Sequence, residues 1–307
     1  MHADAIAFAE YGSPDVLKPA STDVSDPGPG QVRITLRAVG VNPLDAKLRS
    51  GSMASVMPLR LPHIPGLEFA GTIETAGLDV PDLPPGTAVF GTAPLTYAGL
   101  ALADATQLTP IPEGMDYPQA AALPVPAEAA WRALEELGVA DGQTLLVHGA
   151  AGSVGSLAVQ FALARGVRVI GTASAAAQSF VTGLGAHAVT YGAGMAERVR
   201  ALAPDGVDRV LDTSGADVLG DSVDLTGDPS RVLSLVDPVA AQTHGVRFSA
   251  GGPGETRTAA ALNAAAALYA DGNLTQRIHG QMPLAEAARA HRAIEAGGLN
   301  GKIVLTT

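Results

Sequence analysis

The chain has 307 residues, of which 47% are hydrophobic and 16% charged, with a formal net charge of −11. This length exceeds one ordinary core and predicts two domains, and the composition excludes a disordered chain. The acidic balance argues against nucleic acid or an anionic membrane as the partner. Because cysteine is absent, disulfides, thiolate-bound metals and a cysteine nucleophile are excluded.

The first residues, "MHADAIAFAEYG", lack the basic segment and long apolar core of a secretory signal. No apolar run approaches the roughly 20 residues that a transmembrane helix needs. We therefore expect a cytoplasmic protein without a membrane span.

The first part of the chain predicts a compact β domain. Segments 31–42, 70–77 and 86–93 are rich in β-branched residues and are typical of strands. Prolines recur between residues 58 and 85, which excludes long helices there.

Further along, an Ala-rich helical pattern at 118–138 is interrupted by Pro124 and Pro126. Strands and helices then alternate, which predicts a parallel sheet with helices on its faces. The predicted strands are 144–148, 167–172, 187–191, 208–213, 231–236 and 245–250. Helices at 256–272 and 284–297 and a closing strand at 301–307 complete the chain.

The stretch "LLVHGAAGSVGSLAVQFALARG" joins the first of these strands to a helix through Gly149, Gly152 and Gly155. A glycine-rich turn lets backbone N–H groups approach a pyrophosphate, and the following helix N-terminus favours negative charge. With strands on both sides, the pattern predicts a dinucleotide site. The alternative is a packing turn without a ligand. Gly166 is expected to end the helix.

The choice of dinucleotide depends on the end of the second strand. An NAD site places an acidic residue about 20 residues after the turn, on the ribose 2′-hydroxyl. Residues 167–180 contain none, while Thr172, Ser174 and Tyr191 offer hydroxyl groups. No Arg or Lys follows Ser174, so a strong 2′-phosphate site is not predicted either. The balance favours NADPH over NADH.

Several motifs together resemble the medium-chain dehydrogenase/reductase superfamily, in its zinc-free, quinone-oxidoreductase-like branch. The resemblance covers essentially the whole chain. It is carried by "GVNPLDAKLRSG", "HIPGLEFAGTI", "LPVPAEAAWRAL", "VHGAAGSVGSLAVQFA", "LDTSG" and "GKIVL".

The resemblance implies a GroES-like β domain built from both chain ends (1–115 and 275–307) and a doubly wound α/β Rossmann domain at 116–274. It implies NADPH in the cleft and a homodimer. The implied cofactor-binding residues are Asn42, Gly149, Ala150, Gly152, Ser153, Val154, Gly155, Thr172, Ser174, Tyr191, Ser234, Leu235, Val236, Phe248, Ser249, Gly251 and Lys302.

This chain departs from the family pattern at two positions. Ala129 stands where related quinone reductases often have a threonine close to the nicotinamide. Met53 stands where the enoyl-thioester reductases have a proton-donating tyrosine, which counts against a strict enoyl-thioester reductase.

Hydride transfer to a carbonyl compound needs stabilisation of negative charge on oxygen. The seven histidines are scattered without metal-ligand spacing, so no metal is expected, and hydrogen bonds must supply this stabilisation. The candidates are Asn42, Lys47 and Tyr97, besides a backbone N–H or water. Apolar residues of loop 50–62 (Met53, Val56 and Met57), together with Tyr97 and loop 249–255, are expected to contact a flat, weakly charged substrate.

Each of these side chains also has a structural interpretation. Asn42 can satisfy a turn before Pro43, Lys47 can be solvated, and Tyr97 can belong to the core. Asp45 can cap a helix beginning at Ala46, and Glu68 can form a structural ion pair.

Three functions remain open at this stage. The first is an NADPH-dependent quinone or enone reductase. The second is a dedicated tailoring enone or enoyl reductase of a polyketide-like pathway. The third is a non-catalytic NADPH-binding sensor or structural protein.

Overall fold

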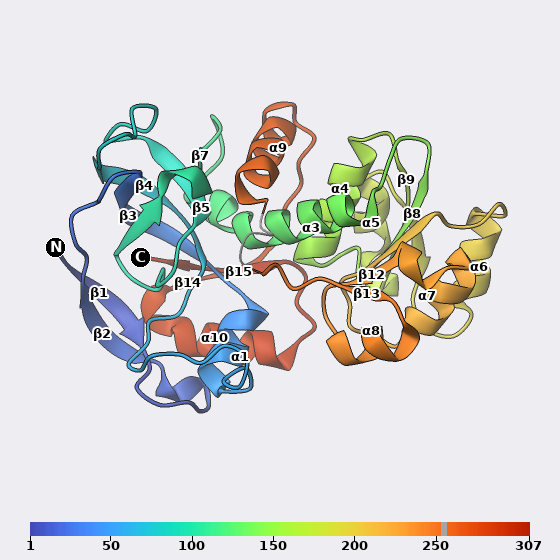
Figure 1. Ribbon diagram of the computed structural model, residues 1–307, viewed down its shortest axis with the longest axis horizontal. Coiled ribbons are helices and arrows are strands. Elements are labelled where there is room, and N and C mark those ends of the chain that lie inside the picture. Colours follow the sequence, from blue (N-terminus) through green and yellow to red (C-terminus); the bar gives the residue numbers. More distant parts are fainter. Residues whose placement is uncertain (253–256) are drawn as a thin grey trace. The chain divides into compact units, whose positions relative to one another are not determined.

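The computed structural model describes residues 1–252 and 257–307, which form two compact units. Unit 1 comprises residues 1–125, 258–272 and 276–307. Unit 2 comprises residues 126–257 and 273–275. Most elements of each unit are labelled in Figure 1.

Unit 1 contains a sheet of order β14-β15-β3-β4-β5-β7, with β6 paired to β3, and a separate β1–β2 hairpin. Its strands are β1 (His2–Ala7), β2 (Lys18–Asp23), β3 (Gln31–Val41), β4 (Glu68–Ala76), β5 (Ala88–Thr92), β6 (Leu100–Asp104), β7 (Leu108–Pro110), β14 (Ile278–Pro283) and β15 (Lys302–Thr306). Its helices are α1 (Pro43–Ser50), α2 (Tyr117–Ala121), α9 (Thr258–Ala270) and α10 (Ala287–Ala296).

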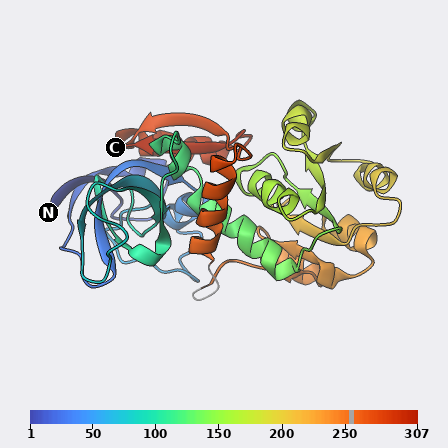
Figure 2. The ribbon, with the colours of Figure 1, turned by 90° about the horizontal axis from the view of Figure 1, so that it is seen from above.

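The C-terminal strands complete the sheet that the N-terminal strands begin. β15 pairs antiparallel with β3, and β14 pairs parallel with β15. Figure 2 shows these red strands lying against the blue and cyan β structure of the N-terminal part. Val32, Ile34 and Leu36 of β3 are almost fully buried in the core of the unit. A β domain formed by both chain ends was the sequence-based expectation.

The division into units differs from the predicted domain boundaries at two longer segments and at the single residue Thr275, which lies in unit 2. Residues 116–125 belong to unit 1, where the hydroxyls of Tyr117 and Thr72 are hydrogen-bonded at 2.9 Å. Residues 258–272 also belong to unit 1, because Asn263 of α9 accepts a hydrogen bond from Thr109 of β7. Both segments are helical, and helical periodicity does not show which sheet a helix will cover.

Unit 2 contains a parallel sheet of order β10-β9-β8-β11-β12-β13. Its strands are β8 (Thr144–His148), β9 (Arg168–Ala173), β10 (His187–Thr190), β11 (Arg209–Asp212), β12 (Val232–Ser234) and β13 (Arg247–Phe248). The helices that follow them are α4 (Ser153–Leu163), α5 (Gln178–Gly183), α6 (Met195–Leu202), α7 (Leu219–Thr226) and α8 (Pro238–His244). The long helix α3 (Pro124–Leu137) leads into the unit.

This strand order starts with β8 in the middle and extends first to one side and then to the other. It is the doubly wound order of a Rossmann sheet, whose ligands bind at the carboxyl ends of the strands where the direction reverses. In Figure 1 the helices of this unit lie on both faces of the sheet. Side chains from α6, α7 and α8 form one core with the sheet, including Val199, Leu219 and Ala241.

The local predictions around the first strand agree closely with the structure. β8 has the predicted bounds, and α4 begins at Ser153 directly after Gly152. The helix ends at Leu163, and Gly166 adopts φ +76° and donates its N–H to the Leu163 carbonyl. Within residues 1–252 and 257–307, no helix is both long and apolar enough to cross a membrane.

Candidate cofactor and catalytic site

The glycine turn of unit 2 has the backbone geometry that a phosphate cradle needs. Gly149 follows β8 with φ +75°, a conformation that strains residues with a Cβ. A Cβ on Gly155 would lie 2.2 Å from the Gly149 carbonyl oxygen. The helix therefore approaches the turn more closely than a residue with a side chain at position 155 would allow. The first N–H groups of α4 therefore lie beside a compact loop at the carboxyl edge of the sheet.

Four polar residues lie in register at or next to the carboxyl ends of neighbouring strands. His148 pairs with Thr172 of β9 and with Asp212 of β11, and Asp212 pairs with Ser234 of β12. All four side chains are at most 2% exposed. His148 immediately precedes the glycine turn, and Ser234 immediately precedes Leu235 and Val236, two of the predicted cofactor residues.

His148 is held as a neutral bridge within this row. Its Nδ1 is 3.1 Å from the Thr172 hydroxyl and its Nε2 is 3.0 Å from the hydroxyl of Ser222 on α7. Burial lowers the pKa of His148 to about 4, against an opposing effect of the Asp212 carboxylate. An uncharged imidazole therefore joins β8 to β9 and to α7 at neutral pH.

This arrangement corrects the prediction that Thr172 supplies a hydroxyl to the cofactor. Thr172 is 2% exposed, and its hydroxyl is hydrogen-bonded to His148. Ser234 is likewise fully buried, and its hydroxyl donates to Asp212 at 2.9 Å. Both residues lie beneath the predicted cofactor surface instead of on it.

Two further predicted cofactor residues, Ser174 and Tyr191, lie at the end of β9. Ser174 follows the strand, and the Gln178 amide donates to the carbonyls of Ala173 and Ser174. The N–H of Tyr191 donates to the Ala173 carbonyl at 3.3 Å, so the tyrosine lies next to this strand end with 60% of its surface exposed. The backbones of Ser174 and Tyr191 therefore lie near each other, and their contact with a 2′-phosphate stays a prediction.

The loops after β12 and β13 contain the remaining predicted cofactor residues of unit 2. Val236 and Phe248 are 38% and 39% exposed, and Leu235 is half-buried. Ser249 is instead held internally, because its hydroxyl donates to Glu136 at 2.7 Å and contacts Arg132. Residues 253–255 of the predicted substrate loop lie outside the described residues.

Gly251 lies close to the same arginine. A Cβ there would meet the Arg132 guanidinium at 3.0 Å. Arg132 also forms an ion pair with Glu128 on its own helix. Arg132 was not among the predicted site residues, although it lies one turn after Glu128 in a helical pattern.

In unit 1, strand pairing brings three distant residues together. Asn42 follows β3, Lys302 begins β15 beside it, and Glu68 begins β4 on the other side. Lys302 Nζ lies 2.5 Å from Glu68 Oε1 and donates to Asn42 Oδ1 at 2.6 Å. Asn42 Nδ2 donates to the same Glu68 oxygen at 2.8 Å.

This triad is buried, with Glu68 at 0%, Asn42 at 3% and Lys302 at 5% exposure. The second Glu68 oxygen accepts the Val125 N–H at 2.8 Å. The structural ion pair predicted for Glu68 is therefore confirmed. Lys302, expected near the cofactor, has its ammonium engaged in this ion pair, and both ends of the Asn42 amide have protein partners.

Asp45 stabilises the start of α1 in a different way from that predicted. The helix begins at Pro43, not at Ala46, and Asp45 Oδ2 accepts the backbone N–H of Asn42 at 2.8 Å. This is the reciprocal arm of a capping box, which fixes the chain direction at Asn42. Burial raises the pKa of Asp45 to about 7, although the hydrogen bond from Asn42 acts against this.

The catalytic and substrate-binding roles predicted for Tyr97 do not agree with its position. Tyr97 is completely buried, and its hydroxyl lies 3.2 Å from Nε2 of His291, which is also fully buried. Burial raises the pKa of the Tyr97 hydroxyl well above its usual value. The side chain belongs to the core of unit 1, as the alternative interpretation held.

Lys47 and the predicted substrate residues lie on and after α1. Lys47 is exposed, and its carbonyl accepts the hydroxyls of Ser50 and Ser52. In the turns that follow, Val56 is 69% and Met57 44% exposed, and both N–H groups donate to the Met53 carbonyl. This exposed apolar segment stays a predicted substrate surface.

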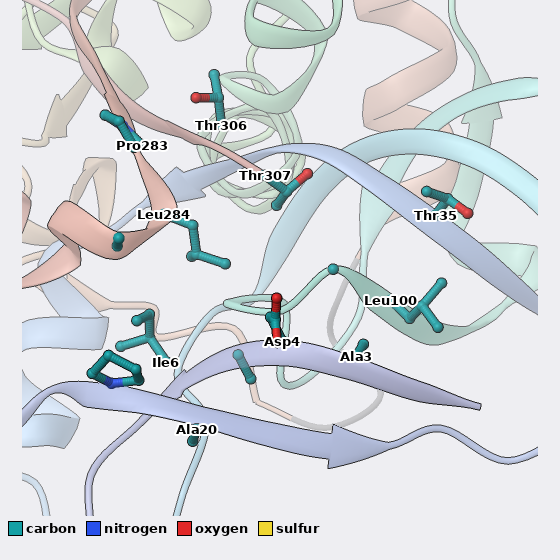
Figure 3. Close-up of a pocket in the computed structure, with 14 residues that line it drawn as sticks. Ala3, Asp4, Ile6, Ala20, Thr35, Leu100, Pro283, Leu284, Thr306 and Thr307 are labelled. Atoms are coloured by element: carbon teal, nitrogen blue, oxygen red, sulfur yellow. The ribbon is translucent and has the colours of Figure 1, made fainter.

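A separate cavity of about 750 Å³ lies entirely within unit 1 (Figure 3). Ala3, Ile6, Leu100 and Leu284 line it together with further small or apolar residues, and Asp4 lies at its side. No predicted site residue is among its lining residues in the described chain. The cavity therefore does not coincide with the triad.

The residues present do not fit a catalytic zinc ion. Zinc in proteins is held by Cys, His and carboxylate ligands, and the chain has no cysteine. Glu68 is already occupied by the Lys302 ammonium. Among residues 1–252 and 257–307, no cluster of three or more His, Asp or Glu side chains is arranged to bind a metal.

Together, the Rossmann sheet with its glycine turn and the second, mostly antiparallel β unit define a two-unit protein of the nucleotide-dependent dehydrogenase type. Residues 28–113 match the family model for the alcohol dehydrogenase GroES-like domain, and residues 184–305 match the zinc-binding dehydrogenase model.

Relatives along the whole chain agree with these matches. The chain is 35% identical over 324 residues to a quinone oxidoreductase of Lama guanicoe, covering 98% of this chain and 96% of that protein. It is 34% identical over 319 residues to the spectinabilin polyketide synthase system protein NorB of Streptomyces orinoci, covering 98% of this chain but only 14% of that protein.

A solved structure of a mycobacterial protein in complex with NADPH superposes with a TM-score of 0.81 at 30% identity, covering 99% of this chain and all of the other. The chain belongs to the medium-chain dehydrogenase/reductase superfamily, in its quinone-oxidoreductase-like branch.

Proposed function

We propose that the protein is an NADPH-dependent oxidoreductase that transfers hydride to a quinone or an α,β-unsaturated carbonyl compound without a metal. The observation that carries this proposal is the glycine turn between β8 and α4, where Gly155 packs directly on the Gly149 carbonyl. Such a turn at the switch point of a doubly wound sheet binds a pyrophosphate through backbone N–H groups.

The preference for NADPH rests on the end of β9. Residues 167–180 contain no carboxylate that would bind a ribose 2′-hydroxyl and repel a 2′-phosphate. Ser174 and the exposed Tyr191 lie together there. When bound, the nicotinamide supplies the hydride, and the protein supplies orientation and electrostatic stabilisation.

Stabilisation of the developing oxyanion is assigned to hydrogen-bond donors of unit 1. Asn42 is held in one orientation by Glu68 and Lys302, and Lys47 is an exposed cation on the adjoining helix. Replacing both Asn42 and Lys47 by alanine is expected to lower kcat with NADPH. Full activity of this double variant would remove both residues from the mechanism.

The test of the proposal follows NADPH oxidation at 340 nm with 9,10-phenanthrenequinone, 1,4-benzoquinone, a simple enone and crotonyl thioester, with NADH in parallel. Turnover of the quinones or the enone with NADPH is the expected result. No turnover despite measurable NADPH binding would contradict the general reductase and favour a dedicated substrate or a binding role.

A second candidate is a tailoring reductase for an enone or enoyl intermediate of a polyketide-like pathway. Its support is the similarity to NorB along almost the whole chain. Met53, at the position of the family's proton-donating tyrosine, weighs against a thioester substrate. Turnover of crotonyl thioester but not of the quinones would favour this candidate.

We further propose that the protein acts as a homodimer in the cytoplasm. Light scattering coupled to size-exclusion chromatography tests the dimer, and a monomeric mass would contradict it.

A further inference from the structure

The carboxylate of Asp212 joins loops that are far apart in the sequence. Asp212 ends β11 at the carboxyl edge of the sheet and is 1% exposed. Its two carboxylate oxygens accept hydrogen bonds from different loops.

The first oxygen shapes the loop that directly follows β11. Oδ1 accepts the Ser214 N–H at 2.9 Å, the Ser214 hydroxyl at 2.7 Å and the Gly215 N–H at 3.3 Å. A charged acceptor with several donors forms stronger bonds than a neutral one. The turn at 213–215 is therefore fixed by the strand that precedes it.

The second oxygen reaches the loop after β12. Oδ2 accepts the Ser234 hydroxyl at 2.9 Å, and the Ser234 oxygen in turn accepts the Val236 N–H at 3.2 Å. The backbone adds a further bond, from the Leu235 N–H to the Asp212 carbonyl. Leu235 and Val236 are two of the predicted cofactor residues.

The β11 loop is tied to the glycine turn as well. Thr213 donates its N–H to the His148 carbonyl at 3.1 Å and its hydroxyl to the same oxygen at 2.7 Å. His148 immediately precedes Gly149. Three loops at the switch point are thus linked through Asp212 and its neighbour Thr213.

We propose that Asp212 is a positioning residue that sets the β11 and β12 loops for the nicotinamide half of the dinucleotide. In a doubly wound sheet the two mononucleotide halves of the cofactor bind over the two halves of the sheet. β8, β9 and β10 form one half, and β11, β12 and β13 form the other. The inference rests on the proposed NADPH binding.

The test replaces Asp212 by asparagine, which keeps the volume but puts an amide NH2 where one oxygen accepts. Asp208→Asn is the matched control, because Asp208 Oδ2 accepts the Thr144 N–H at 2.8 Å at the amino edge of the same sheet. Dissociation constants are measured for NADPH, by its fluorescence, and for adenosine 2′,5′-bisphosphate, by calorimetry.

We expect Asp212→Asn to weaken NADPH binding by roughly 10- to 100-fold, similar in size to the loss of reaction rate that a misplacement of about 1 Å can cause. Binding of adenosine 2′,5′-bisphosphate, which lacks the nicotinamide half, should be unchanged. Asp208→Asn should change neither constant. A general loss of structure would weaken both ligands, so the ratio of the two constants separates the explanations.

Ser234→Ala leaves the Oδ1 bonds intact and removes the hydroxyl that joins Oδ2 to the Val236 N–H, and it serves if Asp212→Asn does not fold. It should weaken NADPH binding in the same direction and by less. An equal loss of affinity for both ligands, or unchanged NADPH binding by these variants, would overturn the positioning role of Asp212 but not the proposed function. If the unmodified protein did not bind NADPH, the proposed function would fail together with this inference.

Discussion

Gly155→Ala tests the glycine turn directly. The added Cβ would lie 2.2 Å from the Gly149 oxygen, 2.8 Å from the Gly149 carbonyl carbon and 3.0 Å from Ala150 Cα. All three atoms belong to the backbone, so no side chain can rotate away. Since unstrained carbon contacts need about 3.5 Å, the helix and the turn must separate by roughly 1 Å.

Two effects of that displacement can be sized. Overpacking of this kind costs about 1–3 kcal/mol of folding free energy. A misplacement of about 1 Å can cost roughly 100-fold in reaction rate, and we expect a loss of similar size, roughly 10- to 100-fold, in NADPH affinity. We therefore expect a lower urea midpoint and a strongly raised dissociation constant for NADPH.

The assay combines urea unfolding with NADPH fluorescence titration. Gly183→Ala is the control, because Gly183 lies in α5 of the same unit and a Cβ there meets nothing within 4 Å. The control should bind NADPH normally and be as stable as the unmodified protein or slightly more so, since alanine favours helix over glycine by about 1 kcal/mol. Normal NADPH affinity of Gly155→Ala would refute the phosphate-cradle reasoning.

Three further predictions concern buried polar groups. Lys302→Met leaves the Glu68 carboxylate buried without its cation and should lower the free energy of unfolding, measured in urea, by about 3–5 kcal/mol. Most of this loss should be recovered in the Lys302→Met/Glu68→Gln double variant. A Lys302→Met variant as stable as the unmodified protein would contradict the role of the ion pair. The pKa of His148 is about 4 in the folded state against an ordinary value of 6.5, so the unfolded state binds more protons between these two pH values. Stability therefore falls as the pH drops from 6.5 to 4, by up to about 3 kcal/mol. His148→Gln should show a flatter profile of urea midpoint against pH in this range. Tyr97→Phe removes the hydrogen bond to His291 and should lower the free energy of unfolding by about 1 kcal/mol without changing kcat. A large fall in kcat would restore the catalytic role of Tyr97.

Local patterns in the sequence were sufficient for the elements around the cofactor edge. The apolar run at 144–148, the three glycines and the helical spacing after them are properties of consecutive residues. Their conformations follow from backbone sterics and from which face of a helix is apolar. For this reason β8, the turn and the start of α4 lie where the sequence predicted them.

The roles of individual polar residues were less predictable. Thr172 and Tyr97 were predicted to donate hydrogen bonds, and the family resemblance implied a cofactor role for Ser234, but each of these buried side chains has a partner inside the protein. Asp212 was overlooked, although it stands within the quoted motif "LDTSG". Its position as the last residue of a parallel strand was the available signal, since such residues face the ligand edge of the sheet.

By itself the sequence determined the class of the fold, the glycine turn and the absence of cysteine ligands for a metal, because each depends on residue types and short-range spacing. Only the tertiary structure decided that Asn42, Glu68 and Lys302 form one buried triad and that β15 completes the sheet begun by β3. Strand register and burial arise from contacts between segments distant in the chain, and they decide which polar groups find internal partners and which remain open to a ligand.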